Sequence, residues 1–109
     1  QVLLLDEPCA GLDPVARERF LAFVDGLASS GGKKGPTLVL ITHHVEEIMP
    51  SFSHALLLKD GIVAASGPKE ACLKAPILSE VFGAKVSLTR RKGRYALAVE
   101  AGRKRGILR

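Results

Sequence analysis

The first thirteen residues constrain the fold of this chain more than any other stretch. Residues 2–5 form an uninterrupted apolar run that ends in Asp6 and Glu7, and Pro8 then prevents the strand from continuing. An apolar run without alternation predicts a strand buried on both faces, as in parallel sheets with helices on either side. Ligands of such sheets bind beyond the carboxyl ends of the strands. Two adjacent carboxylates at that place suit a hard cation and a proton acceptor beside a phosphate ester.

Residues 2–13 resemble the Walker B motif and the D-loop of the ATP-binding-cassette (ABC) ATPases. The family pattern is four apolar residues, Asp-Glu-Pro, two small residues and then Gly-Leu-Asp. This chain departs from it at Cys9, where Thr is more usual. The resemblance implies an α/β fold, namely a P-loop NTPase-type parallel sheet fragment with flanking helices that is followed by β-hairpins. It also implies ATP and Mg²⁺ as cofactors.

A second apolar run, residues 37–42, predicts a parallel strand that is a neighbour or near-neighbour of the first. The helix between the two strands starts with Asp13 as its N-cap and Pro14 in its first position, and it ends near Ser29, before a flexible Gly-rich loop. The spacing predicts one apolar face, with Ala16, Phe20, Phe23, Val24 and Leu27, and an opposite polar face, with Arg17, Glu18 and Asp25.

The carboxylates after the first strand are the candidate centre of the chemistry. The resemblance implies that Asp6 acts on Mg²⁺, through water, because this ion keeps several waters and takes one or two carboxylates beside substrate phosphates. It implies that Glu7 is the general base that orients and deprotonates the attacking water. The simpler interpretations are a turn or capping residue for Asp6 and a solvated surface residue for Glu7.

Two histidines follow the second strand, level with the carboxylates of the first. His43 comes after Thr42, as the switch histidine of the family follows a Thr, and the resemblance implies that its imidazole binds the γ-phosphate and the water. The usual Thr-His-Asp of the family is Thr-His-His here. His44 is the better candidate for a residue that merely caps the next helix, which is predicted over residues 45–49 and ended by Pro50.

Asp13, together with residues 10–12, matches the D-loop, which in the family crosses between two ATPase domains. An N-cap uses one carboxylate oxygen, so both roles of Asp13 can coexist. The partners implied are a second ABC ATPase domain and a transmembrane permease subunit, which would place the protein in the cytoplasm at the inner face of the membrane. Cys9 and Cys72 show no pairing pattern, as is typical of a reducing compartment, and Cys9 is interpreted as a space-filling residue.

Two motifs of the family do not occur in residues 1–109: a Gly-x-x-x-x-Gly-Lys-Ser/Thr phosphate loop and a Leu-Ser-Gly-Gly-Gln signature. In the family both precede the Walker B motif, so the sequence is predicted to be the C-terminal half of an ABC ATPase domain. We expect this half to bind nucleotide weakly or not at all by itself. Without the strand and helix of the nucleotide core, one face of the sheet is expected to be exposed.

The rest of the chain predicts short elements and a division into three parts. The elements are a hairpin of residues 55–58 and 62–65 around an Asp-Gly turn, helices over 69–74 and 77–82 separated by Pro76, and a hairpin of residues 85–89 and 95–99. The parts are residues 1–84, the C-terminal part of the ATPase domain with Walker B, D-loop and histidine switch; 85–100, a C-terminal hairpin; and 101–109, a basic tail expected to be disordered. Residues 53–67 and 78–83 resemble importer ATPases, with metal-chelate and molybdate-type subunits most similar.

Charge is divided unevenly along the chain. Residues 85–109 hold nine Lys or Arg and one Glu, a net charge of +8, whereas residues 1–84 hold seven Lys or Arg and ten Asp or Glu, a net charge of −3. The alternative function is that of a non-catalytic regulatory or nucleic-acid-binding ABC paralogue that uses the basic tail. Nucleic acid is disfavoured because Tyr95 is the one aromatic residue in the basic stretch 85–109 that is available for base stacking. The intact Asp6, Glu7 and His43 disfavour a purely regulatory role.

Overall fold

The structure is a computed structural model that describes residues 1–30 and 35–100. The predicted disordered tail, residues 101–109, and most of the Gly-rich stretch of the predicted loop, residues 31–34, lie outside the described residues. The described part divides into two compact units. The first contains Gln1–Phe52 and Arg91–Tyr95, and the second contains Ser53–Arg90 and residues 96–100.

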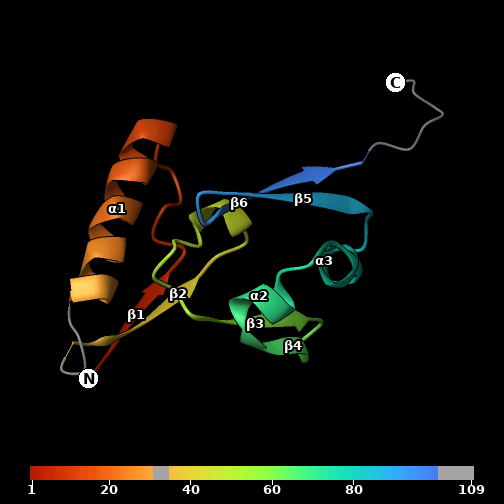
Figure 1. The fold of residues 1–109 in the computed structure, drawn as a ribbon, viewed down its shortest axis with the longest axis horizontal. Helices are drawn as coiled ribbons and strands as arrows, with labels where there is room; N and C mark the ends of the chain where they lie inside the picture. The colour runs from red at the N-terminus through yellow and green to blue at the C-terminus, as the bar shows by residue number, and fades with distance from the viewer. Residues whose placement is uncertain (31–34, 101–109) are drawn as a thin grey trace. The chain divides into compact units, whose positions relative to one another are not determined.

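The first unit is built on two parallel strands that are connected through a helix (Figure 1). β1 (Val2–Asp6) pairs with β2 (Thr37–Ile41), from Val2 opposite Thr37 to Asp6 opposite Ile41. α1 (Pro14–Ser30) lies between them in the sequence, and the single 3-10 turn η2 (Val45–Glu47) follows β2. The predicted parallel neighbours are confirmed, although the helix predicted over residues 45–49 is only one turn. Because the pairing runs to the last residue of both strands, the segments that leave their carboxyl ends start side by side.

The prediction that β1 is buried on both faces is wrong in this structure. Leu3 is 39% exposed and Leu4 is 59% exposed, and successive residues of a strand point to opposite faces. Burial of a strand on both sides requires further layers, and within the described residues the β1–β2 sheet has two strands. One face of the sheet was expected to be exposed, and in the structure both faces are exposed.

The core of the first unit lies beyond the carboxyl ends of the strands. Cys9, Leu21 and Met49 form a buried cluster against which Phe20 and Phe52 pack. Cys9 comes from the segment after β1 and Met49 from the segment after η2, so α1 packs against both loops that leave the sheet. Burial of such side chains is worth about 1.5–3 kcal/mol each, and this packing holds the two loops in place.

The buried face of α1 differs from the predicted one. Leu21 and Val24 are 0% and 1% exposed, whereas Phe23, which was predicted to be buried, is 64% exposed. Asp25, predicted on the polar face, instead accepts a hydrogen bond from the backbone N–H of Ser51 at 3.1 Å. The buried stripe is therefore rotated around the helix, because its position depends on where the loops after the strands lie.

The second unit contains a hairpin and two short helices. β3 (His54–Lys59) and β4 (Ile62–Pro68) pair antiparallel, with Lys59 opposite Ile62, and are followed by α2 (Lys69–Cys72) and α3 (Ala75–Phe82). β5 (Val86–Arg91) and β6 (Arg94–Val99) then pair with each other, and their turn with its flanking residues, Arg91–Tyr95, belongs to the first unit. Both predicted hairpins are confirmed.

The two hairpins share one turn conformation. Asp60 and Gly61 have φ values of 52° and 77°, and Lys92 and Gly93 have values of 53° and 77°. Two successive residues with positive φ define a two-residue turn that matches the right-handed twist of the flanking strands. The Asp-Gly signal therefore places the first turn correctly.

The prediction that Pro76 separates the two short helices is wrong, because α3 begins at Ala75 and Pro76 lies inside it. Proline is tolerated in the first turn, where the N–H that it lacks has no partner within the helix. The helix ends at Gly83, whose φ of 69° is left-handed, and its N–H donates to the Glu80 carbonyl at 3.3 Å.

Among the described residues, the helices fall short of the length and hydrophobicity that a membrane span needs.

The N-cap of α1 is directly testable. The Asp13 Oδ1 atom accepts a hydrogen bond from the Ala16 N–H at 2.8 Å. We expect Asp13→Ala to lower the free energy of unfolding by about 1 kcal/mol, and Asp13→Asn, which keeps a capping oxygen, to lower it much less. Urea denaturation of the parent and both variants measures this. Equal stability of all three proteins would contradict the capping role.

Candidate functional site

Glu7 leaves the carboxyl end of β1 in an unusual backbone conformation. Its N–H donates to the Ile41 carbonyl oxygen at 2.9 Å, which continues the β1–β2 pairing by one bond. Its φ is 48°, a left-handed value that carries a steric cost for a residue other than Gly. Strained residues of this kind cluster at functional sites. The conformation therefore marks Glu7 as a candidate functional residue independently of its sequence motif.

Glu7 and His43 lie together at the ends of the paired strands. The His43 Nε2 atom is 3.1 Å from the Glu7 Oε2 atom, and the two side chains are 84% and 33% exposed respectively. The two groups are in close polar contact, but their orientation falls outside hydrogen-bond geometry, and the Oε2 atom is closed to solvent. A carboxylate and an imidazole at this distance can both act on one small ligand or water.

Asp6 is the exposed last residue of β1, where it pairs with Ile41. Mg²⁺ in nucleotide sites keeps several waters and uses one or two carboxylates together with phosphate oxygens. A single exposed carboxylate next to Glu7 fits this requirement. Within residues 1–30 and 35–100, no three His, Cys, Asp or Glu side chains gather into a cage made of protein ligands alone.

Asp13 is engaged in the helix cap described above, and its backbone carbonyl also accepts a hydrogen bond from the Arg17 N–H at 2.9 Å. The structure therefore brings Glu7 and His43 into contact and gives Asp13 a capping bond instead. His44 occupies the N-cap position of η2, but its side chain makes no capping bond.

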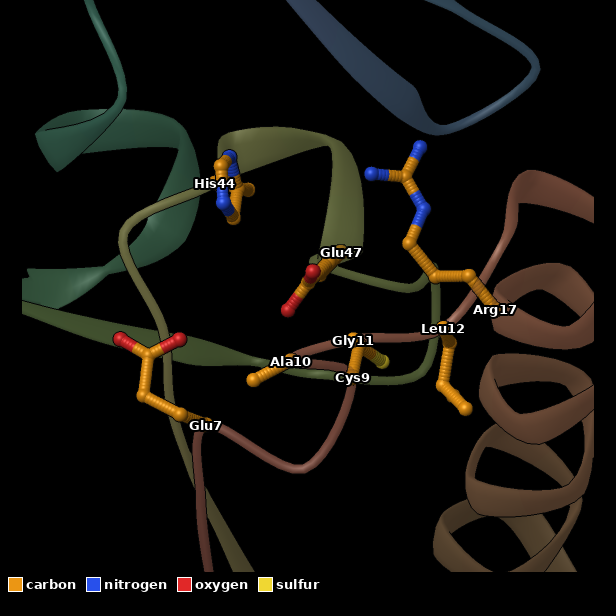
Figure 2. A pocket seen from close by; sticks show the side chains of 8 residues that line it. All are labelled: Glu7, Cys9, Ala10, Gly11, Leu12, Arg17, His44 and Glu47. Carbon is orange, nitrogen blue, oxygen red and sulfur yellow. The ribbon is translucent and has the colours of Figure 1, made fainter.

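A pocket of about 240 Å³ adjoins Glu7 in the first unit. Figure 2 shows the side chains of Glu7, Glu47 and Arg17 around it. Gly11 supplies part of its floor with a φ of 83°, which favours glycine. The complete lining is Glu7, Cys9, Ala10, Gly11, Leu12, Arg17, His44 and Glu47. The D-loop segment and the segment after β2 thus share one small cavity that contains two carboxylates and one guanidinium group.

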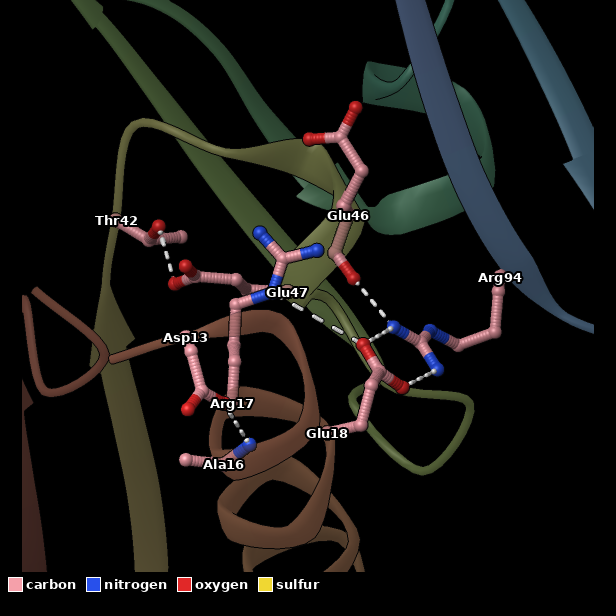
Figure 3. Close-up of polar contacts among 8 residues, drawn as sticks. All are labelled: Asp13, Ala16, Arg17, Glu18, Thr42, Glu46, Glu47 and Arg94. Atoms are coloured by element: carbon pink, nitrogen blue, oxygen red, sulfur yellow. Dashed lines mark hydrogen bonds and ion pairs between the residues drawn. The ribbon is translucent and has the colours of Figure 1, made fainter. Parts of the chain in front are cut away.

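Thr42 and Glu47 form a hydrogen bond that the sequence did not predict. The Thr42 hydroxyl donates to the Glu47 Oε1 atom at 2.6 Å, and Glu47 is 3% exposed (Figure 3). A buried carboxylate needs such a partner, since burial without one is costly. A signal does exist in the sequence, because Glu47 stands at an alternate position between the buried Val45 and Met49.

Cys9 is a buried core residue, 6% exposed, as its space-filling interpretation predicts. Burial raises the pKa of its thiol above the ordinary value, and the nearby Glu47 carboxylate raises it further. The reactive form of cysteine is the thiolate. A raised pKa therefore keeps this thiol protonated near neutral pH and favours packing over reactivity.

Arg94 joins three segments of the first unit. Its guanidinium group donates to both Glu18 carboxylate oxygens, at 2.9 and 3.1 Å, and to the Glu46 carbonyl oxygen at 2.7 Å (Figure 3). This hydrogen bonding lowers the pKa of Glu18 and raises the pKa of Arg94. The fork-like pair links α1 to η2, next to the pocket.

Comparison with known proteins finds ABC transporter ATP-binding proteins as relatives of this chain. An uncharacterised ABC transporter ATP-binding protein of Bacillus subtilis is 44% identical over 82 residues, which cover 75% of this chain and 30% of that protein. A second uncharacterised ABC transporter ATP-binding protein, from Lactococcus lactis, is 39% identical over 95 residues, covering 87% and 36%. A thiamine import ATP-binding protein of Vibrio vulnificus is 37% identical over 67 residues, covering 62% and 27%. No family model matches the chain.

The solved structures supply the fold. A chain of an ABC transporter described as metal-chelate type, in an inward-facing conformation, matches with a TM-score of 0.75 at 22% identity, covering 93% of this chain and 40% of that chain. The described part of this chain therefore has the fold of a part of that transporter chain. The sequence relatives identify the chain as a homologue of ABC transporter ATP-binding proteins.

The chain spans between 27% and 36% of the length of these three sequence relatives. This partial coverage is consistent with the predicted C-terminal fragment of an ATPase domain. The same relatives give no support to the alternative of a regulatory or nucleic-acid-binding paralogue.

The Glu18–Arg94 pair predicts a pH dependence of stability. Because the pKa of Glu18 is lowered in the folded state, the pair stabilises the fold above about pH 4.5, the ordinary value of a free Glu, and this contribution is lost as the pH falls further. We expect Glu18→Gln to remove part of the acid destabilisation seen in the parent. Urea unfolding at a series of pH values measures it, with the exposed Glu80→Gln as control. An acid limb as steep in Glu18→Gln as in the parent would overturn the assignment.

Proposed function

We propose that this chain forms part of the ATP-hydrolysing site of an ABC transporter ATP-binding subunit. The observation that carries the proposal is the contact between Glu7 and His43, 3.1 Å apart where two parallel strands end in register. In this proposal residues 1–84 are the C-terminal part of the ATPase domain, residues 85–100 a C-terminal hairpin and residues 101–109 a basic tail.

Asp6 and Glu7 divide two tasks between them. Asp6 would hold Mg²⁺, through water, and the ion would neutralise charge on the phosphates. Glu7 accepts a proton from the attacking water and orients it, as a general base must from within hydrogen-bond reach. The contact of its carboxylate with His43, which follows β2, supports this role.

His43 is the second group that acts on the water and on the terminal phosphate. An imidazole can donate from one nitrogen and accept at the other, so it can bridge a phosphate oxygen and the water held by Glu7. Its high exposure leaves space in front of the ring for a ligand that residues outside this chain help to bind. The phosphate loop and the signature motif would come from those residues.

Partners follow from the same proposal. Asp13 and the D-loop segment, residues 10–12, would approach a second ABC ATPase domain, while the side-chain oxygen of Asp13 continues to cap α1. A transmembrane permease would hold the ATPase dimer at the cytoplasmic face of the membrane, where ATP hydrolysis powers transport. The relatives that are ABC transporter ATP-binding proteins, including one named for thiamine import, support this assembly.

The substitution Glu7→Gln tests the proposed role of Glu7 as the general base. In the complete ATP-binding subunit, we expect Glu7→Gln to lower kcat by about 10²- to 10⁴-fold, because an amide cannot accept the proton. ATP binding should persist, since Gln has the same size and no charge to repel the phosphates. Steady-state hydrolysis and equilibrium binding of an ATP analogue measure the two quantities.

The matched control is Glu80→Gln, which makes the same chemical change at an exposed position on α3. This control should hydrolyse ATP at the parental rate. Hydrolysis by Glu7→Gln at that same rate would show that Glu7 is not the base.

A further inference from the structure

The Thr42 hydroxyl makes two hydrogen bonds whose directions are fixed. The His44 N–H donates to the Thr42 Oγ1 atom at 3.0 Å, because a backbone N–H can only donate. A hydroxyl has one proton, and that proton is directed to the Glu47 Oε1 atom at 2.6 Å. The Thr42 hydroxyl thus links the Glu47 carboxylate to the backbone of His44 through two hydrogen bonds.

His43 lies between the two residues that this arrangement fixes. Thr42 precedes it and His44 follows it, and the bond from His44 N to Thr42 Oγ1 closes a turn with His43 at its apex. The imidazole itself is 84% exposed. Packing therefore does little to orient the ring, and its direction toward Glu7 depends on the backbone of this turn.

Glu47 is well suited to hold such a turn. It is 3% exposed, and its N–H donates to the His44 carbonyl at 3.0 Å. The same residue therefore binds the turn through its backbone and through its side chain. Arg94 in addition stabilises η2 by donating a hydrogen bond to the Glu46 carbonyl oxygen. A rigid support of this kind is what places a functional side chain accurately.

We propose that Glu47, acting through the Thr42 hydroxyl, is a positioning residue that holds His43 against Glu7 during ATP hydrolysis. This inference rests on the proposed function. Glu47 is not itself a catalytic residue here, because its carboxylate is bonded to Thr42 and contacts no reacting group. It also lines the pocket with Arg17 and Gly11, so the support of His43 adjoins the D-loop segment.

The test uses variants of the complete ATP-binding subunit that remove or keep each half of the bond. Thr42→Val removes the hydroxyl at nearly constant shape, and Thr42→Ser keeps it. Glu47→Ala removes the acceptor, and Glu47→Gln keeps an acceptor oxygen without the charge. Thr37→Val, at the start of β2, and Glu80→Ala, at an exposed position on α3, are the matched controls.

We expect Thr42→Val and Glu47→Ala to lower kcat by about 10- to 100-fold, the cost of misplacing a reacting group by about 1 Å, while KM for ATP changes less. Thr42→Ser and Glu47→Gln should stay within about threefold of the parent, because both retain the hydrogen bond. The controls should hydrolyse ATP at the parental rate.

The same substitution in a His43→Ala protein separates the positioning of His43 from a general loss of stability. If the bond acts through His43, then Thr42→Val causes no further loss of kcat in a His43→Ala protein. The imidazole ¹⁵N resonances of His43 should also shift in Thr42→Val and not in Thr42→Ser. A full additional loss in the His43→Ala background, or parental kcat in Thr42→Val, would overturn the inference.

The same experiment distinguishes this inference from the proposed function. A parent that hydrolyses ATP and loses activity in Glu7→Gln, but not in Thr42→Val, leaves the function standing and removes only the role of Glu47. A parent without hydrolysis overturns the function, and the positioning role in catalysis with it, whatever the resonances of His43 show. Melting temperatures identify any Glu47→Ala protein that has failed to fold. In that case the kcat of Thr42→Val tests the inference by itself.

Discussion

The parallel pairing of β1 with β2 is the constraint on which the rest of the site depends. The strands are in register up to Asp6 and Ile41, and the Glu7 N–H extends the pairing by one bond. Glu7 and His43 follow within two residues of these ends and meet at 3.1 Å. A shift of the register by one residue would turn the side chains at the strand ends to opposite faces. The carboxylate and the imidazole would then be separated without any change in their sequence motifs.

Packing against α1 holds the two loops that carry the site. α1 contributes Leu21 to a cluster with Cys9 and Met49, one from each loop, while the strands themselves stay largely exposed. Arg94 adds a charged link between Glu18 and the Glu46 carbonyl. The site therefore draws its local order from packing beyond the sheet. Its homologues are ABC transporter ATP-binding proteins about three times as long as the matched segment, as the 30% coverage of one of them indicates.

Local signals predicted much of this correctly. The apolar runs placed β1 and β2, the Asp-Pro pair placed the start of α1, and the Asp-Gly pair placed the first hairpin turn. Burial was harder to predict because it depends on which elements meet. Leu3 and Leu4 are exposed for want of covering layers, and Leu21 replaces Phe23 in the core because the loops lie on that side of the helix.

The missed parts of the site depend on contacts that no local pattern encodes. The Thr42–Glu47 bond requires a buried acidic residue in a turn that reads as polar, and Glu18 pairs with Arg94 from 76 residues away in the sequence. The location of His43 level with Asp6 and Glu7 was predicted, because the ends of parallel strands meet at one edge of a sheet.

A double-mutant cycle on Glu7 and His43 would show whether the two residues act as one unit on ATP. The measurement is kcat of the complete subunit as Glu7→Gln, as His43→Ala and as both. Residues that act together are strongly non-additive, so we predict a double variant within about threefold of Glu7→Gln alone. Losses that multiply in the double variant would instead show that the two residues act independently.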